Sequence, residues 1–549
     1  MVAPRAMDQV ETTTVGEPVS ALSPLRIPVF RAIWIANTVS SVGSLIQSVG
    51  ASWLMTSITS SADMVALVQS SVALPLMLLS LVAGALADNM DRRKLMLASQ
   101  TFMMLTSIAL TVCAWLGLMT PWLLLFFTFL IGCGGAFNAP AWQASVRDMV
   151  PREQLPGAVA LTSVGYNIAR SLGPAIGGAL VAATGPAAAF TVNAITYTGL
   201  IAVLLRWRSP HVPQSLPRET LGTAMVVGIR YVAMSPVVRT VLLRGFLFGL
   251  GSSSVMALMP LVAKHLVGGG PITFGVLLGA FGVGAIAGAM GSAYLRSRLT
   301  SEGIVRLASM VIAVATLTLG FSTHLWLTTL ALVVGGAAWL MAFATFNITV
   351  QMSAPRWVSA RALSIYQMNT FGGMALGSWL WGVIAQHYGL TPALTASAGV
   401  LLGCAVIGRV LSLPNVEQLN LSPQRAPTQP NTAVSVSPHT GPVMATVEYR
   451  IREGELATFF SVMSERRRIR RRDGAHDWTL LRDLADPQIW IERYQVATWA
   501  DYIRHHNRAT QEDALVSERL RVLHCDPRPP VSRRMVEQEL DAQLAGRIS

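Results

Sequence analysis

Arg170 is a positively charged side chain within a long apolar stretch of the chain. It lies 12 residues after the start of the run at 158–182 (170 − 158), and we treat it as the exception to an otherwise uncharged interior. A charge near the middle of a membrane-crossing helix is costly, so it faces a cavity or a partner. Two roles are open: Arg170 attracts an anionic or phenolic group of a bound molecule, or it hydrogen-bonds to main-chain carbonyls freed by Pro174 or a neighbouring helix.

Uncharged polar side chains within the apolar runs are the other candidates for binding chemistry. They are Asn37, Gln47, Gln69, Asn138, Gln143, Tyr166, Asn167, Asn347, Gln351, Tyr366, Gln367 and Asn369. Each one can hydrogen-bond to a neighbouring helix or to a bound molecule. Amides and aromatic rings around one cation suit a bulky, partly polar organic molecule better than a small ion.

Carboxylates mark where proton chemistry could take place, and here they lie at or near the ends of the apolar runs. They are Asp63, Asp88, Asp91, Asp148, Glu153, Glu219 and Glu302. Proton coupling would therefore have to involve Asp88 or Asp148. We expect neither a metal site nor a cofactor, because no residues have metal-ligand spacing and the four cysteines fit small buried hydrophobic side chains.

The composition is that of a membrane protein. Of the 549 residues, 52% are hydrophobic and 13% are charged, and the mean hydropathy is +0.49. A helix needs about 20 apolar residues to cross a bilayer. Twelve runs are of that order: 28–56, 64–87, 95–118, 121–146, 158–182, 187–206, 238–263, 272–295, 303–321, 324–350, 361–386 and 391–412. The fold class we predict is an all-α membrane protein with a small α+β domain at its C-terminal end.

The two halves of the apolar region resemble each other. The segment that begins at Pro151 matches the one that begins at Pro355, an offset of 204 residues (355 − 151). Without a gap, glycines fall on glycines: Gly173 on Gly377, Gly178 on Gly382 and Gly185 on Gly389. Many membrane transporters are built from such repeats, so we predict two six-helix halves.

Basic residues gather in alternate loops. One set of loops contains Arg92, Arg93, Lys94, Arg147, Arg152, Arg206, Arg208, Arg218, Arg230, Arg239, Arg296, Arg298, Arg356 and Arg361. The other set has Lys264 as its main exception. Because cytoplasmic loops carry an excess of Lys and Arg, we expect both termini in the cytoplasm, and the first residues do not have the pattern of a secretory signal peptide. The net charge of +13 fits this rule and does not indicate a nucleic-acid partner.

Composition shifts along the chain predict its domains. We expect an N-terminal cytoplasmic tail at 1–24, a first bundle at 25–206, a connecting loop at 207–237, a second bundle at 238–414, a linker at 415–442 and a cytoplasmic module at 443–549. The connecting loop has mixed apolar and basic character. It is either a short amphipathic helix on the inner leaflet or an ordinary tether.

The module at 443–549 has the pattern strand, helix, two strands, helix and strand, which is ferredoxin-like. We expect one helix over 499–523, and a preceding helix that ends in the run Arg466–Arg472, which would face anionic lipid or water. His505 and His506 are adjacent, point to different faces and are expected on a solvated surface. The pattern resembles the small antibiotic-biosynthesis-monooxygenase-like domains, which pair as α/β barrels and so imply self-association.

Two motifs carry a resemblance to the major facilitator superfamily. GALADNMDRRK, at 84–94, resembles its signature loop, and ARSLGPAIGG, at 169–178, resembles the fifth-helix motif of its exporters and antiporters. The resemblance implies gating or conformational roles for Gly84, Asp88, Arg92, Arg93, Gly173, Pro174, Gly177 and Gly178. FNAPAWQASVRDMVPREQLPGAVAL and VVGIRYVAMSPVVR look like the branch that contains enterobactin exporters and transmembrane secretion effectors.

This resemblance implies a twelve-helix major facilitator fold in the plasma (inner) membrane. The activity it implies is secondary export of a small organic molecule by alternating access, with H+ as the expected coupling ion and a siderophore, drug or secondary metabolite as cargo. In the superfamily the first, fourth, seventh and tenth helices line the cavity. The substrate-binding candidates are therefore Asn37, Gln47, Asn138, Gln143 and Asn347, together with Arg170.

The rival hypothesis is a membrane-tethered enzyme or sensor whose working part is the module at 443–549. Twelve crossings with an internal repeat exceed what an anchor needs, so transport is favoured. A channel fits the doubled halves poorly.

Overall fold

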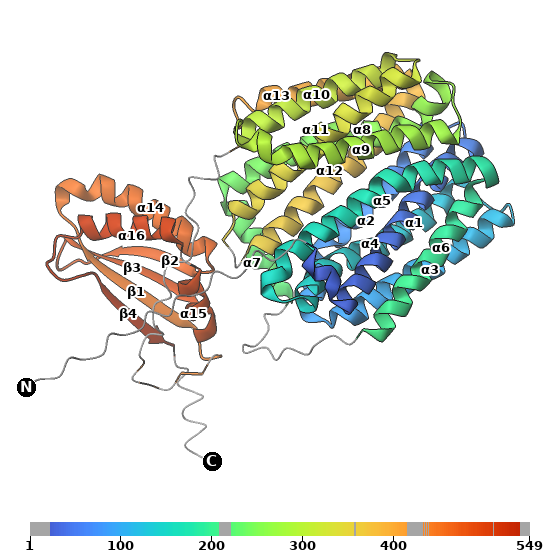
Figure 1. Ribbon diagram of the computed structural model, residues 1–549. Helices are drawn as coiled ribbons and strands as arrows, with labels where there is room; N and C mark the ends of the chain where they lie inside the picture. The colour runs from blue at the N-terminus through green and yellow to red at the C-terminus, as the bar shows by residue number, and fades with distance from the viewer. Residues whose placement is uncertain are drawn as a thin grey trace, which may run out of the picture.

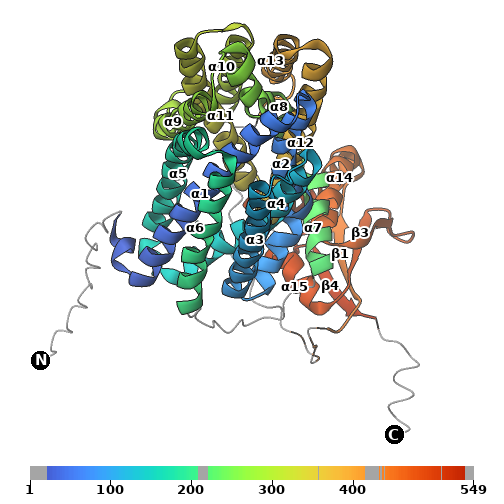
Figure 2. The same ribbon diagram turned by 90° about the vertical axis from the view of Figure 1, so that its right-hand side faces the viewer.

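The structure is a computed structural model that describes residues 22–207, 221–355, 358–413, 432, 434, 436, 437, 439–508 and 510–537. Most of the predicted tail (1–24) and linker (415–442) lies outside the described residues, as does the side chain of Asp88. A large helical body stands beside a smaller domain that contains a sheet (Figures 1 and 2).

The helical body consists of two groups of six helices, and each helix overlaps one of the twelve predicted runs. The first bundle contains α1 (Pro28–Ile58), α2 (Ala62–Asn89), α3 (Arg92–Trp115), α4 (Pro121–Met149), α5 (Leu155–Thr184) and α6 (Pro186–Arg206). The second contains α8 (Pro236–Leu261), α9 (Pro271–Arg296), α10 (Ser301–Phe321), α11 (Leu325–Met352), α12 (Ser359–Tyr388) and α13 (Leu390–Ile407). A short helix, α7 (Leu221–Met234), precedes the second bundle and shows that part of the connecting loop is helical.

Local sequence explains where these helices start and which can cross a membrane. Helices α1, α4, α6, α8 and α9 each begin with a proline, whose fixed φ and missing N–H suit the first turn. Ten helices of the described chain are long and apolar enough to cross a membrane, and these are the bundle helices other than α5 and α12. The chain is therefore a multi-pass membrane protein.

The internal repeat appears in the structure as two matching helix corners. Helices α5 and α12 both have 30 residues, and their bounds differ by the same 204 positions at each end (359 − 155 and 388 − 184). Each ends at a glycine with left-handed backbone, Gly185 with φ 87° and Gly389 with φ 93°. Because other residues adopt this conformation only with strain, the two glycines fix equivalent turns into α6 and α13.

The bundles meet mainly through α2 with α12 and α5 with α9. At Gly178 an added Cβ would lie 2.7 Å from the carbonyl oxygen of Pro271 and 2.9 Å from the Cα of Gly275. The repeat partner Gly382 is similarly placed, with 2.9 Å to the Cα of Asp63. Small residues let helix backbones approach in this way, so the repeated glycines build the interface between the bundles.

One hydrophobic cluster joins the two bundles at one end of the helical body. We call the end where Arg92 and Arg296 lie the basic end, and the other the opposite end. The shared cluster lies at the opposite end and contains Phe190 of the first bundle and Phe274 of the second. Trp53 and Phe274 stack across the interface there, with ring centroids 6.4 Å apart.

Toward the basic end the core divides in two. One cluster contains Phe30, Trp142 and Trp207 and belongs to the first bundle. The other contains Phe248 and Phe346 and belongs to the second bundle and α7. The bundles are thus joined by apolar packing at the opposite end and have separate cores at the basic end.

The C-terminal domain is a four-stranded antiparallel sheet with helices on one face. Its strands are β1 (Val443–Arg450), β2 (His476–Arg482), β3 (Ile489–Val496) and β4 (Val531–Val536), in the order β2-β3-β1-β4. Its helices are α14 (Leu456–Arg472), α15 (Trp499–Asn507) and α16 (Gln511–Leu523). The single helix expected over 499–523 is wrong, because Thr510 and Asp513 form a reciprocal capping box that starts a new helix.

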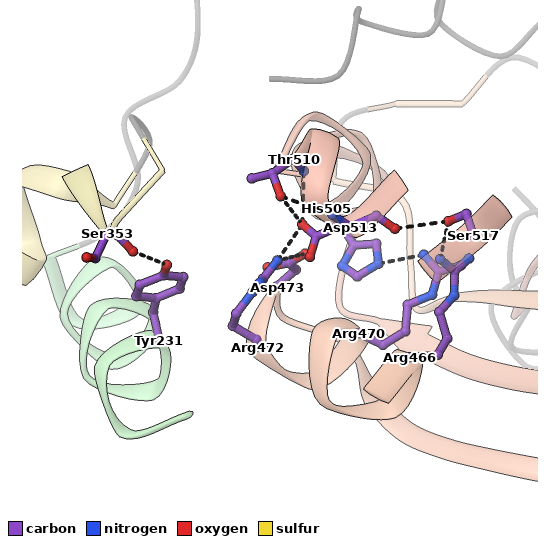
Figure 3. A network of polar contacts seen from close by, with 10 residues as sticks. All are labelled: Tyr231, Ser353, Arg466, Arg470, Arg472, Asp473, His505, Thr510, Asp513 and Ser517. Carbon is purple, nitrogen blue, oxygen red and sulfur yellow. Dashed lines mark hydrogen bonds and ion pairs between the residues drawn. The ribbon is translucent and has the colours of Figure 1, made fainter. Parts of the chain in front are cut away.

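The C-terminal domain contacts the helical body at α7. The guanidinium of Arg472 lies 5.7 Å from the ring centroid of Tyr231, and the Tyr231 hydroxyl donates to the carbonyl oxygen of Ser353, 3.1 Å away (Figure 3). Ser353 terminates α11. The contact therefore links the module to the second bundle.

We predict that Gly178→Ala destabilises the helical body, because the added methyl group meets main-chain atoms that cannot rotate away. Overpacking of this kind costs about 1–3 kcal/mol. Gly199→Ala is the matched control, since a Cβ there has nothing within 4 Å. Thermal unfolding of the purified chain in detergent measures both, and equal melting temperatures for the two variants would contradict this account of the interface.

Candidate functional site

The loop at 84–94 joins three helices of the first bundle at the basic end. The Asp91 carboxylate accepts from the main-chain N–H of Arg93 at 2.9 Å and so caps α3. Arg92 forms an ion pair with Asp148 near the end of α4, at 2.7 Å. Arg93 donates to the carbonyl oxygens of Leu204 (2.9 Å) and of the next residue at the end of α6. The loop therefore holds α3, α4 and α6 together.

Gly84 faces the other bundle. A Cβ there would lie 3.3 Å from the hydroxyl oxygen of Ser364 in α12. The predicted gating residues are thus divided: Gly84 lies on the interface between bundles, whereas Arg92 and Arg93 hold one bundle together.

A buried ion pair in the second bundle was missed from the sequence. Arg244 of α8 is 2% exposed and pairs with Glu302 in the first turn of α10. Arg244 also donates to the carbonyl oxygen of Leu411 at 3.1 Å, and Glu302 accepts from the N–H of Leu413 at 3.0 Å. The expectation that Arg170 is the exceptional charge of the interior is therefore wrong, and Arg244 within the run 238–263 was the available signal.

Arg170 lies at the middle of α5 and faces aromatic rings of the second bundle. Its guanidinium carbon is 4.5 Å from the ring centroid of Trp339 in α11 and 5.6 Å from that of Phe281 in α9. Within the described part of the chain it makes no hydrogen bond or ion pair. The bond to a carbonyl near Pro174, one of the two roles considered, is not formed there.

The fifth-helix motif packs α5 against two helices. Gly173 and Gly177 face α1, where added Cβ atoms would lie 2.7 Å from the Cβ of Leu45 and 3.1 Å from the Cα of Ile46. Gly178 faces α9 instead. Pro174 lies inside α5 without ending it, and its carbonyl oxygen is 2.7 Å from the Cβ position of Gly275. The motif therefore places Arg170 between the bundles.

Gln47 takes part in a buried network inside the first bundle. Its side-chain oxygen accepts from Asn193 of α6 at 2.6 Å and from Ser107 of α3 at 2.7 Å. Gln47 is 6% exposed. The structure places this amide between α1, α3 and α6, away from the other substrate-binding candidates.

The remaining candidates lie in the basic-end halves of three helices. Asn37 of α1 and Asn138 of α4 are half-buried, and Gln143 of α4 is exposed. The side-chain oxygen of Asn138 is buried without a partner among the described residues. Asn347 of α11 accepts from Gln351 one turn further on. Their binding of substrate stays a prediction.

The C-terminal domain buries a charged cluster under its sheet. Glu492 of β3 is fully buried and accepts from Arg470 and Trp478, each at 3.1 Å. Burial alone would raise the pKa of Glu492, but the guanidinium groups of Arg470 and then Arg466 outweigh it and lower this pKa to about 2. Arg466, Arg470 and Arg472 therefore turn toward protein partners, contrary to the expected lipid- or water-facing run (Figure 3). Arg467, Arg468 and Arg471 of the same run are exposed, as expected.

His505 belongs to the same cluster. It is 3% exposed and accepts from Arg470 at 3.1 Å, so the expected solvated surface is wrong for this residue. Burial first, and then the positive charge of Arg470, lower the pKa of His505 well below its usual value and that of His506 to about 4. Among the described residues there is no group of His, Cys, Asp and Glu that could hold a metal ion.

Comparison with known proteins decides the family. Residues 19–542 match the family described as transmembrane secretion effector. The chain belongs to the transmembrane secretion effector family of the major facilitator superfamily. Among its relatives, the multidrug efflux pump Tap of Mycolicibacterium fortuitum is 25% identical over 71% of this chain and 97% of that protein. The enterobactin exporter EntS of Salmonella typhi is 27% identical over 70% of this chain and 92% of that protein.

Solved transporters share the fold of this secretion-effector chain. A bacterial homologue of the human lysosomal transporter Spinster, in an inward-facing and unoccupied conformation, superposes with a TM-score of 0.58 at 15% identity, covering 72% of this chain and 98% of that one. A mutant of the nucleoside transporter NupG superposes with a TM-score of 0.56 at 13% identity, covering 70% of this chain and 100% of that one. The chain is a membrane transporter of an efflux family and not an enzyme.

We predict that Glu302→Gln destabilises the second bundle by about 3–5 kcal/mol, because it leaves Arg244 buried without a counter-charge. Arg306→Gln is the control. Arg306 also pairs with Glu302, but its side chain is 36% exposed and the pair is looser, at 3.7 Å. Its loss should therefore cost less than about 1 kcal/mol. Thermal unfolding in detergent measures each. An Arg244→Met/Glu302→Gln double variant should lose less unfolding free energy than Glu302→Gln alone, because no charge is then left unpaired. A loss in the double variant equal to the sum of the losses in the two single variants would refute this.

Acidification should loosen the C-terminal domain. A histidine whose pKa is lower in the folded state than its usual value of about 6.5 contributes its full stability above about pH 6.5. This stability is lost as the pH falls from about 6.5 toward the folded-state pKa, by at most about 1.4 kcal/mol per pH unit for each histidine. Hydrogen exchange of β3 in the full chain, corrected for intrinsic rates, should lose protection from pH 7 to pH 5. His506→Gln should reduce this loss, and an unchanged pH dependence in the variant would exclude His506 as its source.

Proposed function

We propose that the chain is a secondary active transporter that exports a small organic molecule by alternating access. The observation that supports this is the branched core: the bundles share a large apolar cluster at the opposite end and a small one around Ala73 of α2 and Met374 of α12, and they have separate cores at the basic end. Rocking of the two bundles about their interface would open the basic end and the opposite end in turn.

The proposal includes a definite orientation. Basic loops mark the cytoplasmic side, so the basic end faces the cytoplasm, both termini are cytoplasmic, and the branched core corresponds to an inward-facing state in the plasma membrane. Helices α5 and α12 complete twelve crossings in this proposal. They have 30 residues each and stand between the bundles, where less apolar helices are shielded from lipid.

The names of two relatives support a cargo class. One is named as a multidrug efflux pump and another as an enterobactin exporter, so we propose a drug, siderophore or secondary metabolite. Asn37, Asn138, Gln143, Arg170 and Asn347 would line the path, whereas Gln47 is engaged inside the first bundle. Proton coupling is part of the proposal, with Asp88 or the Arg92-paired Asp148 as its carboxylate.

We propose a ferredoxin-like fold for the C-terminal domain. Its sheet order β2-β3-β1-β4 and its antiparallel pairing support this. The sheet is covered by helices on one face, and the other face, with Met444 and Ile491 half-buried, offers a surface for self-association. The domain would then be an accessory to transport.

Efflux in everted vesicles tests the function. Vesicles that contain the full chain should accumulate at least one compound from a panel of siderophores and drugs, and a protonophore should abolish the accumulation if H+ is the coupling ion. Vesicles without the chain are the control, and a chain that ends at Pro414 shows whether the module is accessory. If no compound accumulates above the control although the chain is folded, the proposed function is wrong.

A further inference from the structure

The cations of the helical body differ in how their charge is balanced. Arg244 has the carboxylate of Glu302, and Arg92 has that of Asp148. Arg170 has aromatic rings instead, and within the described residues neither a carboxylate nor a carbonyl contacts it. A cation at this depth, about 22 Å along α5 from its start at 1.5 Å per residue, needs a negative partner in a medium of low dielectric constant.

The rings leave the donors of Arg170 free. The guanidinium carbon of Arg170 lies 4.5 Å from the ring centroid of Trp339, within the range of a cation–π contact, which uses no N–H donor. The N–H groups of a guanidinium match the two oxygens of a planar anion. The ring centroids of Trp339 and Phe343 are 4.3 Å apart, so Phe343 extends the aromatic surface by one turn toward the basic end.

Tyr166 lies on the same face of α5 as Arg170, one turn nearer the basic end. It is 57% exposed. A molecule that entered from the basic end would thus meet aromatic side chains of both bundles, Tyr166 on one side and Phe343 on the other, before it reached the cation.

We infer that Arg170, Trp339 and Phe281 form the binding site for an anionic aromatic group of the cargo, an aromatic carboxylate or a deprotonated phenol. The inference rests on the proposed function and names its substrate class. The anion neutralises Arg170 through paired hydrogen bonds, and its ring packs against the indole of Trp339. Because α5 belongs to the first bundle and α9 and α11 to the second, the site contacts both moving bodies.

Three probes of matched shape separate charge from aromaticity. They are 2-naphthoate, its neutral isostere 2-naphthamide and the non-aromatic anion decahydro-2-naphthoate. Binding to the purified full chain in lipid nanodiscs is measured by calorimetry. The expected result is that naphthoate binds at least tenfold tighter than either of the other two, because only naphthoate supplies both the charge and the ring.

Variants assign the effect to the residues. Arg170→Gln should weaken naphthoate at least tenfold and leave naphthamide unchanged, while Arg170→Lys keeps part of the preference for the anion. Trp339→Leu should reduce the preference for naphthoate over decahydro-2-naphthoate and keep the preference for naphthoate over naphthamide. This variant tests the site even if Arg170→Gln fails to fold. Arg298→Gln is the matched control, because Arg298 stacks on Tyr294 at 5.0 Å outside the site.

Equal affinity of the wild-type chain for naphthoate and naphthamide, or no binding of naphthoate, overturns the inference, as does an unchanged naphthoate affinity in folded Arg170→Gln. If the chain gives such a result but exports another compound from everted vesicles, the binding-site inference is wrong and the proposed function stands. If the chain prefers naphthoate to naphthamide but exports no compound, the binding site stands and the proposed function is wrong.

Discussion

Main-chain contact between the bundles is the constraint on which the rest of the structure depends. Where α5 meets α9, the Cβ position of Gly178 is 2.9 Å from the Cα of Gly275, and that of Gly282 is 2.5 Å from the carbonyl oxygen of Arg170. Small residues let the backbones of the two bundles approach closely here. The three large apolar clusters lie toward the two ends of the helical body, and a small one lies between α2 and α12.

Charged side chains at the helix ends hold each bundle together. In the first bundle Arg93 of α3 binds carbonyl oxygens at the end of α6. In the second, Glu302 of α10 binds a main-chain N–H just after α13, and Arg244 binds a carbonyl beside it. Different residues thus perform the same task, which is to attach the third helix of each bundle to the sixth. Because these pairs lie at the ends, the charge of Arg170 stands apart from them.

The sequence predicts the features that depend on local pattern. Run lengths predict all twelve bundle helices, and the repeat predicts the matching corners at Gly185 and Gly389, because both follow from residue type alone. The partners of Gln47, Arg244 and Arg170 could not be predicted, since each contact joins residues more than 50 positions apart. The start of a new helix at Thr510 could have been predicted, because Thr-Gln-Glu-Asp is a capping-box pattern. The prediction missed it because the helical spacing of apolar residues continues across Thr510.

The attachment of the C-terminal domain is compatible with moving bundles. Its described contact with the helical body runs from Arg472 to Tyr231 of α7 and on to Ser353, the residue that follows α11 (Figure 3). Tyr231 is part of the apolar cluster of the second bundle. In the proposed rocking motion, a domain that is attached to one bundle would travel with that bundle. The branched core, the paired charges at the helix ends and this attachment through α7 are therefore compatible with the proposed rocking of two bundles, with Arg170 and its aromatic partners at the line where they meet.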